Sequence, residues 1–176
     1  MKQLLTIALL SVIFVSCNKN DGKPSSANGV DFTSIRKFDI EANFVGTEGD
    51  ASDDYIHEDW PQWVYDAFKP LDSVNLQGYV KSPVSIDALY PNPFAETQTM
   101  RMFATQPINL KVMIIDINKN VLFLNSYHVF SAINSIRFDY NDVDMKPKTH
   151  YRMFYAFSAE GMPYYSRGHI DIYKAE

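Results

Sequence analysis

The chain has 176 residues, which fits one domain with a tail. Hydrophobic residues make up 46% of the chain and aromatic residues 14%, which is enough to build a sizeable core and excludes an intrinsically disordered protein. The formal net charge is −5 and the basic residues are scattered. This argues against a nucleic-acid partner, because phosphate binding needs clustered lysine and arginine.

The N-terminus has the pattern of an export signal. Lys2 precedes an apolar run over residues 4–15, which is about as long as the hydrophobic region of a signal peptide. The run is too short to span a bilayer, because a transmembrane helix needs roughly 20 apolar residues. We therefore expect residues 1–16 to be a signal peptide.

The only cysteine of the chain, Cys17, follows Ser16 directly after this run. The sequence FVSC resembles the lipobox of bacterial lipoproteins, which implies cleavage before Cys17 and acylation of that residue with fatty acids such as palmitate. The alternative is an ordinary signal peptide followed by a cysteine by chance. Because there is no second cysteine, disulfides, thiol catalysis and cysteine metal sites are not expected.

Residues 17–30 are predicted to hold the lipidated cysteine and a flexible tether, because Asn, Gly, Ser, Pro and Lys dominate without periodicity. Acyl chains hold a protein on a membrane without a transmembrane helix. We expect the protein in the cell envelope, anchored to the outer membrane. The sequence does not decide between the periplasmic face and the cell-surface face of that membrane.

Residues 31–83 are predicted to be an N-terminal segment of strand and helix that packs on the following domain. Apolar residues favour one strand over residues 37–45 and another over residues 74–80. Between them, Asp59 can cap a short helix that Pro70 ends. Five apolar positions recur at helical spacing, so we expect them to face a core. They are Trp60, Trp63, Val64, Ala67 and Phe68.

An acidic loop lies between the first strand and the helix. Carboxylates of this kind bind Ca²⁺, but the spacing and glycine of an EF-hand loop are missing, and runs of charge are usually solvated. We expect a solvated loop, with a calcium site as the alternative. The candidate ligands are Asp50, Asp53, Asp54 and Glu58.

From residue 84 onward the pattern is typical of β-strands. Val84–Tyr90 and residues 97–105 are predicted strands, and residues 108–114 alternate apolar with mostly polar side chains, as in a half-buried strand. A turn then leads to a partner strand over Val121–Val129. The turn residues Asp116, Asn118 and Asn120 mimic a calcium loop, but the glycine of such a loop is missing, so a tight turn is favoured.

Three later segments complete the β pattern. Residues 136–140 and 151–157 alternate apolar and polar side chains, and residues 163–173 follow a turn at Glu160 and Gly161. About seven short strands separated by turns favour a mainly β protein with an Ig-like antiparallel β-sandwich over residues 84–176, preceded by one short helix.

An unusual corner joins the first two strands of this region. Proline cannot donate a ladder hydrogen bond, and it holds the residue before it extended. We therefore expect the chain to turn a corner here without pairing. The motif consists of Tyr90, Pro91, Asn92, Pro93 and Phe94.

This corner, the hairpin over residues 111–121 and the closing hairpin over residues 151–173 resemble a known module. They are similar to the C-terminal sorting domains of type IX secretion cargo and to the Ig-like domain of flagellar hook-cap proteins. The resemblance covers residues 84–176 and implies an Ig-like fold. It implies no catalytic residues, because those modules have none.

Sequence motifs for catalysis are absent, and the histidines are dispersed. The expected function is therefore a non-enzymatic interaction or accessory module in an envelope complex, with no cofactor and with another envelope protein as partner. The alternatives are a type IX sorting domain and a surface glycan-binding protein. Tyr164 and Tyr165 point to opposite faces of their strand, so one of them is a candidate for surface contact.

Overall fold

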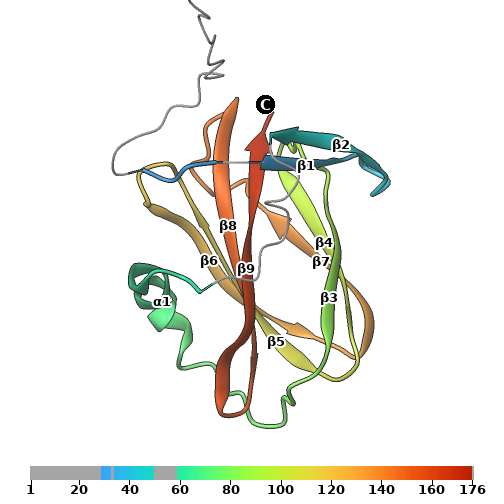
Figure 1. Cartoon of the computed structure of the whole chain (residues 1–176), viewed down its shortest axis with the longest axis vertical. Coiled ribbons are helices and arrows are strands. Elements are labelled where there is room, and N and C mark those ends of the chain that lie inside the picture. Colours follow the sequence, from blue (N-terminus) through green and yellow to red (C-terminus); the bar gives the residue numbers. More distant parts are fainter. Residues whose placement is uncertain (1–28, 33, 50–58, 176) are drawn as a thin grey trace, which may run out of the picture.

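The computed structural model describes residues 29–32, 34–49 and 59–175 (Figure 1). In these ranges it contains nine strands, the helix α1 and the 3₁₀-helix η2. No helix among these residues is long and apolar enough to cross a membrane. The elements are β1 (Ser34–Phe38), β2 (Phe44–Gly49), α1 (Gln62–Phe68), η2 (Lys69–Leu71), β3 (Val84–Tyr90), β4 (Thr97–Ala104), β5 (Ile108–Ile115), β6 (Val121–Val129), β7 (Ala132–Asp139), β8 (Thr149–Ala159) and β9 (Met162–Lys174).

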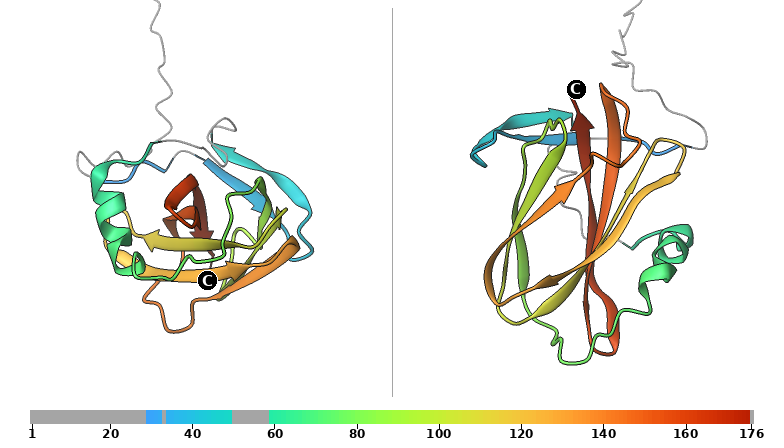
Figure 2. Two further views of the ribbon diagram at one scale, coloured as in Figure 1. Left: turned by 90° about the horizontal axis from the view of Figure 1, so that it is seen from below. Right: turned by 180° about the vertical axis from the view of Figure 1, so that it is seen from behind.

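Seven of the strands form the two sheets of a sandwich. One sheet has the order β3-β4-β7, the other the order β6-β5-β8-β9, and all pairs are antiparallel. The predicted mainly β fold with an Ig-like sandwich of about seven strands is confirmed. The remaining two strands, β1 and β2, pair with each other and lie across one end of the sandwich, as Figure 2 shows from two further sides.

The main core fills the space between the two sheets. Met100 and Met102 of β4 and Phe138 of β7 meet Leu110 and Val112 of β5 there, and all five are buried. They lie at alternate positions of their strands, as the two-residue period of a strand requires. Alternation in the sequence thus places the core between the sheets.

The central strand β5 is buried on both faces, so the prediction of a half-buried strand is wrong. Leu110 and Val112 face the main core, whereas Met113 and Ile115 face a second apolar cluster on the other side. The reason is a cover over the outer face of this sheet, which residues 60–71 provide.

The helix α1 forms that cover. Trp60, Val64 and Phe68 are buried against Phe154 of β8, and the rings of Trp60 and Phe68 stack at 5.3 Å between centroids. The predicted apolar stripe therefore does face a core. The start of the helix differs from the prediction, because Pro61 occupies the N-cap position and Asp59 instead pairs with Arg167.

One buried ion pair fastens the segment after α1 to the sheet. The side chain of Lys111 on β5 is 1% exposed, and its Nζ lies 3.1 Å from Oδ1 of Asp72. The Tyr164 hydroxyl donates to the same oxygen at 2.8 Å, and the Tyr164 ring centroid lies 4.8 Å from Lys111 Nζ. The ammonium group is thus held by one carboxylate and one aromatic face.

Two predicted strands of the N-terminal segment are wrong. Residues 37–45 are split by a turn, because Oδ1 of Asp39 accepts the amides of Glu41 at 2.9 Å and Asn43 at 2.8 Å and Ala42 takes a φ of 65°. Residues 74–80 form turns rather than a strand, and Gly78 there has a φ of 84°.

The corner at residues 90–94 is hydrogen-bonded to β1 and β9, so the expectation that it turns without pairing is wrong. This bonded corner around Asn92 is called the joint below. Asn92 exchanges two backbone hydrogen bonds with Phe38, at 2.9 and 3.0 Å. Its side-chain Nδ2 donates to the carbonyls of Arg36 at 2.9 Å and Asp171 at 3.2 Å, and its Oδ1 accepts the amide of Tyr173 at 3.1 Å. The peptide bonds before both prolines of the motif are cis.

The substitution Asn92→Ala is expected to lower the free energy of unfolding by at least about 2 kcal/mol. It removes the partners of three backbone groups on β1 and β9, and each buried group left unpaired costs about 1–3 kcal/mol. Urea unfolding measures the loss. The exposed Asn125→Ala is the control, and equal unfolding midpoints for the two variants would contradict the role of Asn92.

Replacing Asp72 and replacing Lys111 are expected to change the free energy of unfolding by different amounts. Asp72→Ala leaves the Lys111 ammonium buried without a carboxylate, which we expect to cost about 1–3 kcal/mol, less than for a fully buried pair because Asp72 is 48% exposed. Lys111→Met keeps the apolar stem and leaves Asp72 in contact with water, so stability should stay within about 1 kcal/mol of the unchanged protein.

Urea unfolding of both single variants and of the double variant measures this asymmetry. In the double variant, Lys111→Met should recover most of the stability that Asp72→Ala loses, because no buried charge remains. A Lys111→Met variant as unstable as Asp72→Ala would show instead that the pair itself stabilises the fold.

Candidate functional site

Several residues singled out in the sequence lie outside the described part of the chain. They are Cys17, Asp50, Asp53, Asp54 and Glu58. Among the residues that the structure does describe, no group of three or more histidine, cysteine, aspartate or glutamate side chains is placed to hold a metal ion. The calcium and lipid sites therefore stay predictions from the sequence.

The turn over residues 116–120 forms as predicted. Oδ1 of Asp116 accepts the backbone amides of Asn118 and Asn120, both at 2.8 Å, and its Oδ2 accepts Nδ2 of Asn120 at 2.8 Å. Lys119 takes a φ of 67° between them. Both carboxylate oxygens are engaged in closing the turn, as in an Asx-turn.

Tyr164 and Tyr165 point to opposite faces of β9, as alternation requires. Tyr164 packs into the cluster beneath α1, where burial and its hydrogen bond to the Asp72 carboxylate raise its pKa. Tyr165 packs against the main core and donates to the carbonyl of Ser82 at 3.2 Å, and burial raises its pKa. Both rings are half-buried and held in place by the fold.

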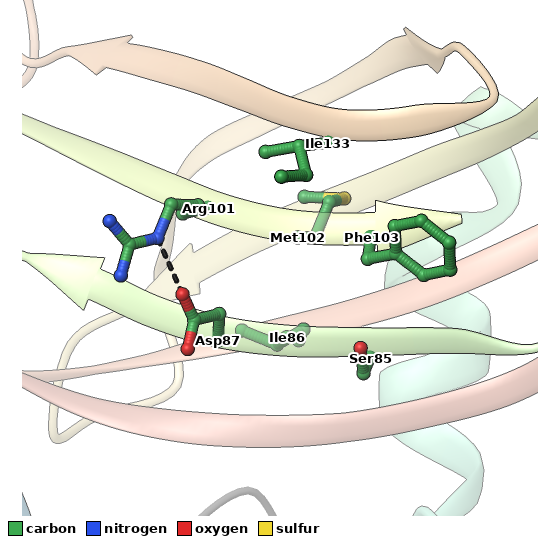
Figure 3. A pocket seen from close by; sticks show the side chains of 7 residues that line it. All are labelled: Ser85, Ile86, Asp87, Arg101, Met102, Phe103 and Ile133. Carbon is green, nitrogen blue, oxygen red and sulfur yellow. Dashed lines mark hydrogen bonds and ion pairs between the residues drawn. The ribbon is translucent and has the colours of Figure 1, made fainter.

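One candidate binding site is a pocket on the outer face of the β3-β4-β7 sheet, with a volume of about 560 Å³ (Figure 3). This size falls within the range of ligand pockets. It is an open depression on the sheet surface. The lining residues are Ser85, Ile86, Asp87, Arg101, Met102, Phe103 and Ile133.

Strand register builds the apolar half of the pocket. Ser85 of β3, Phe103 of β4 and Ile133 of β7 lie side by side in one row across the sheet. Phe103 is 46% exposed and Ile133 is 74% exposed. A solvent-facing row normally carries polar side chains, so two large apolar residues in one row mark this face as unusual.

An ion pair forms the polar half. The register between β3 and β4 shifts between Ile86 and Ala88, and the bulged residue Asp87 meets Nε of Arg101. Figure 3 shows the two side chains pointing toward each other beside the apolar row. The Tyr90 ring centroid lies 5.9 Å from the guanidinium carbon of Arg101. The pocket thus combines the Asp87 carboxylate, the Arg101 guanidinium and the exposed ring of Phe103.

Sequence reasoning did not find this pocket, although one signal for it exists. Strict alternation in residues 97–104 places Phe103 on the same face as Thr99 and Arg101, which is the polar face. An aromatic residue there departs from the alternation of apolar inward and polar outward side chains in an antiparallel sheet with one solvated face. The contribution of Ile133 depends on the register between β4 and β7, which the sequence does not show.

Comparisons with known proteins give a distant structural likeness. No protein family matches the sequence, and no curated protein matches it. Among solved structures, the crystal structure of dimeric latent PorU from Porphyromonas gingivalis matches with a TM-score of 0.42 and 18% identity. The match covers 56% of this chain and 10% of that chain, so this protein is similar in structure to a small part of PorU.

Proposed function

We propose that this protein is a lipid-anchored lipoprotein of the outer membrane whose non-catalytic Ig-like sandwich binds another envelope protein. The observation that carries the binding role is the pocket on the outer face of β3-β4-β7, where Phe103 and Ile133 lie exposed beside the Asp87–Arg101 pair. Support for the anchor comes from the lipobox-like sequence that ends at Cys17.

The composition of this face suits protein recognition. Binding energy in protein interfaces concentrates in a few residues, among which aromatic side chains and arginine are enriched, surrounded by polar groups. Phe103 supplies the ring and Arg101 the guanidinium, and the outward Ser85, Thr99 and Ser135 supply a polar surround. On the opposite sheet, the segment that contains α1 packs over Met113, Ile115 and Phe154 of the outer face.

The position of the pocket also fits a tethered binding module. The row that contains Phe103 lies beside the first residues of β3, whereas Asn92 follows the last residue of β3. Val30 donates to the carbonyl of Ile117, at the same end of the sandwich as the joint (Figure 1). An anchor attached through the N-terminal segment therefore leaves the pocket at the far part of the molecule.

Lipid attachment is tested by metabolic labelling with an alkyne fatty acid. The unchanged protein should carry the label and fractionate with membranes, and Cys17→Ser should do neither, because the chain has no other cysteine. Labelling that persists in Cys17→Ser, or is missing from the unchanged protein, contradicts the anchor.

The binding face is tested by photo-crosslinking in cells. A photoreactive residue at Ser135, beside the pocket, should yield a discrete cross-linked protein, and one at the exposed Gln62 of α1 should not. Phe103→Asp should reduce the yield at Ser135 at least about tenfold, because loss of a central contact costs about 2 kcal/mol or more. Val121→Asp is the matched control, since Val121 is 45% exposed and lies on β6.

Equal cross-linking from both positions, or no effect of Phe103→Asp, contradicts a protein-binding role for this face.

The glycan alternative has its own support, because an exposed ring beside a carboxylate and a guanidinium also suits a sugar. Glycan-array binding that Phe103→Asp abolishes, together with no cross-linked protein, would favour that alternative.

A sorting role is a second candidate, favoured by the corner, the β5-β6 hairpin and the β8-β9 hairpin, which follow one another as in type IX sorting domains. A periplasmic reporter fused to residues 29–176 tests it better than one fused to residues 84–176, because Phe38 and Trp60 supply contacts to the sandwich. A reporter that stays in the periplasm contradicts this role.

A further inference from the structure

We propose that the tip of the β1-β2 hairpin inserts into the interface of the bilayer that holds the lipid of Cys17. The proposal rests on the lipid anchor of the proposed function and adds a second membrane contact to it. The tip is defined here as residues 39–45, the turn and the first two residues of β2.

The tip carries three exposed apolar side chains beside its polar residues Asp39, Glu41 and Asn43. Ile40 in the turn is 79% exposed, Val45 is 62% exposed and Phe44 is 54% exposed. Ile40 lies in the turn and Phe44 and Val45 are the first two residues of β2, where the register shift between Lys37 and Phe38 makes Val45 a bulged residue. Clustered exposed apolar residues mark contacts with proteins or membranes. The proposed anchor at Cys17 brings a bilayer to this end of the molecule, so a lipid contact is the one we argue.

The hairpin is held rigidly enough to present this tip. Phe38 at the end of β1 pairs with the buried Asn92, and Asp39 closes the turn through the amides of Glu41 and Asn43. The guanidinium of Arg36 lies 5.3 Å from the ring centroid of Phe44 and 5.4 Å from that of Phe38. Insertion therefore needs little further ordering, which keeps its entropic cost low.

The charges at the tip set the depth of insertion. Hydrogen bonds from Asn43 lower the pKa of Asp39, which keeps its carboxylate ionised, and Glu41 lies beside it in the turn. Charged groups are expensive in the hydrocarbon core and tolerated near the headgroups. The tip therefore contacts the interfacial region, as apolar and aromatic side chains of anchoring segments do.

The tether brings the tip to the membrane. The hairpin lies at the end of the sandwich where Val30 binds the carbonyl of Ile117 (Figures 1 and 2). Residues 18–28 span at most about 40 Å even when fully extended. The lipid therefore holds this end close to the bilayer, and the second contact forms at a high effective concentration. Even a weak interfacial affinity is then sufficient.

The full-length acylated lipoprotein, reconstituted into phosphatidylcholine vesicles, provides the test. Because Cys17 is acylated and no other cysteine exists, a cysteine introduced at Ile40 or Val45 is the only thiol that an environment-sensitive NBD dye can label. Met162→Cys is the matched control, since Met162 is 44% exposed and begins β9 at the opposite end of the sandwich.

The NBD emission at positions 40 and 45 should shift to shorter wavelength on reconstitution, and lipids with a shallow doxyl group should quench it at least threefold more than at position 162. Equal quenching at all three positions overturns the proposal. A shift without doxyl quenching also overturns it, because a second copy or another protein surface would then cover the tip.

Mass spectrometry of the same samples separates this result from the anchor. Protein without an acyl group on Cys17 that stays off the vesicles contradicts the proposed lipid anchor. Acylated, vesicle-bound protein whose tip probes remain in water contradicts only the inserted hairpin.

Discussion

The hydrogen bonds of one buried side chain, Asn92, hold together segments that are far apart in the sequence. An amide side chain can donate two hydrogen bonds and accept others without carrying a charge, so it can serve backbone carbonyls and a backbone amide at once. Asn92 does so for Arg36 on β1 and for Asp171 and Tyr173 on β9. Three elements thereby meet at one point, and the hairpin, the corner and the last strand keep their relative positions. An apolar residue of similar size would leave those groups unpaired.

A second constraint follows from the central strand β5. Its outward side chains include Met113 and Ile115, which need an apolar cover, and Lys111, which needs a counter-charge. The segment around α1 supplies the first through Trp60, Val64 and Phe68, and the residue that follows η2, Asp72, supplies the second. The segment before the sandwich is thus part of one folded unit with it.

Local patterns predicted much of this fold. One failure came from a local turn that was predicted as a strand, and the others came where distant partners decide the outcome. The same pattern, D-I-x-x-N, closes the turns at residues 39–43 and 116–120 through identical hydrogen bonds. The second was predicted as a turn because strands on both sides are strongly periodic. The first was predicted as a strand because Phe38, Ile40 and Phe44 suggested one. The partners of the Asn92 side chain lie 56 to 81 residues away, and the pocket needs three strands in register, so neither could be derived from sequence alone.

The attachment of β1 also has a mechanical consequence. Tension applied through the N-terminal segment would reach Val30 and β1 before it reached the seven-stranded sandwich. Val30 has one backbone hydrogen bond to Ile117, and Arg152 of β8 donates to the carbonyl of Asp31. The strand β1 is joined to Asn92 through the backbone of Phe38 and the carbonyl of Arg36. Those few bonds would break first, one after another, and the chain would lengthen while the paired strands from β3 to β9 stayed intact. The contacts around Asn92 would therefore give way before the β3-β4-β7 sheet came under load.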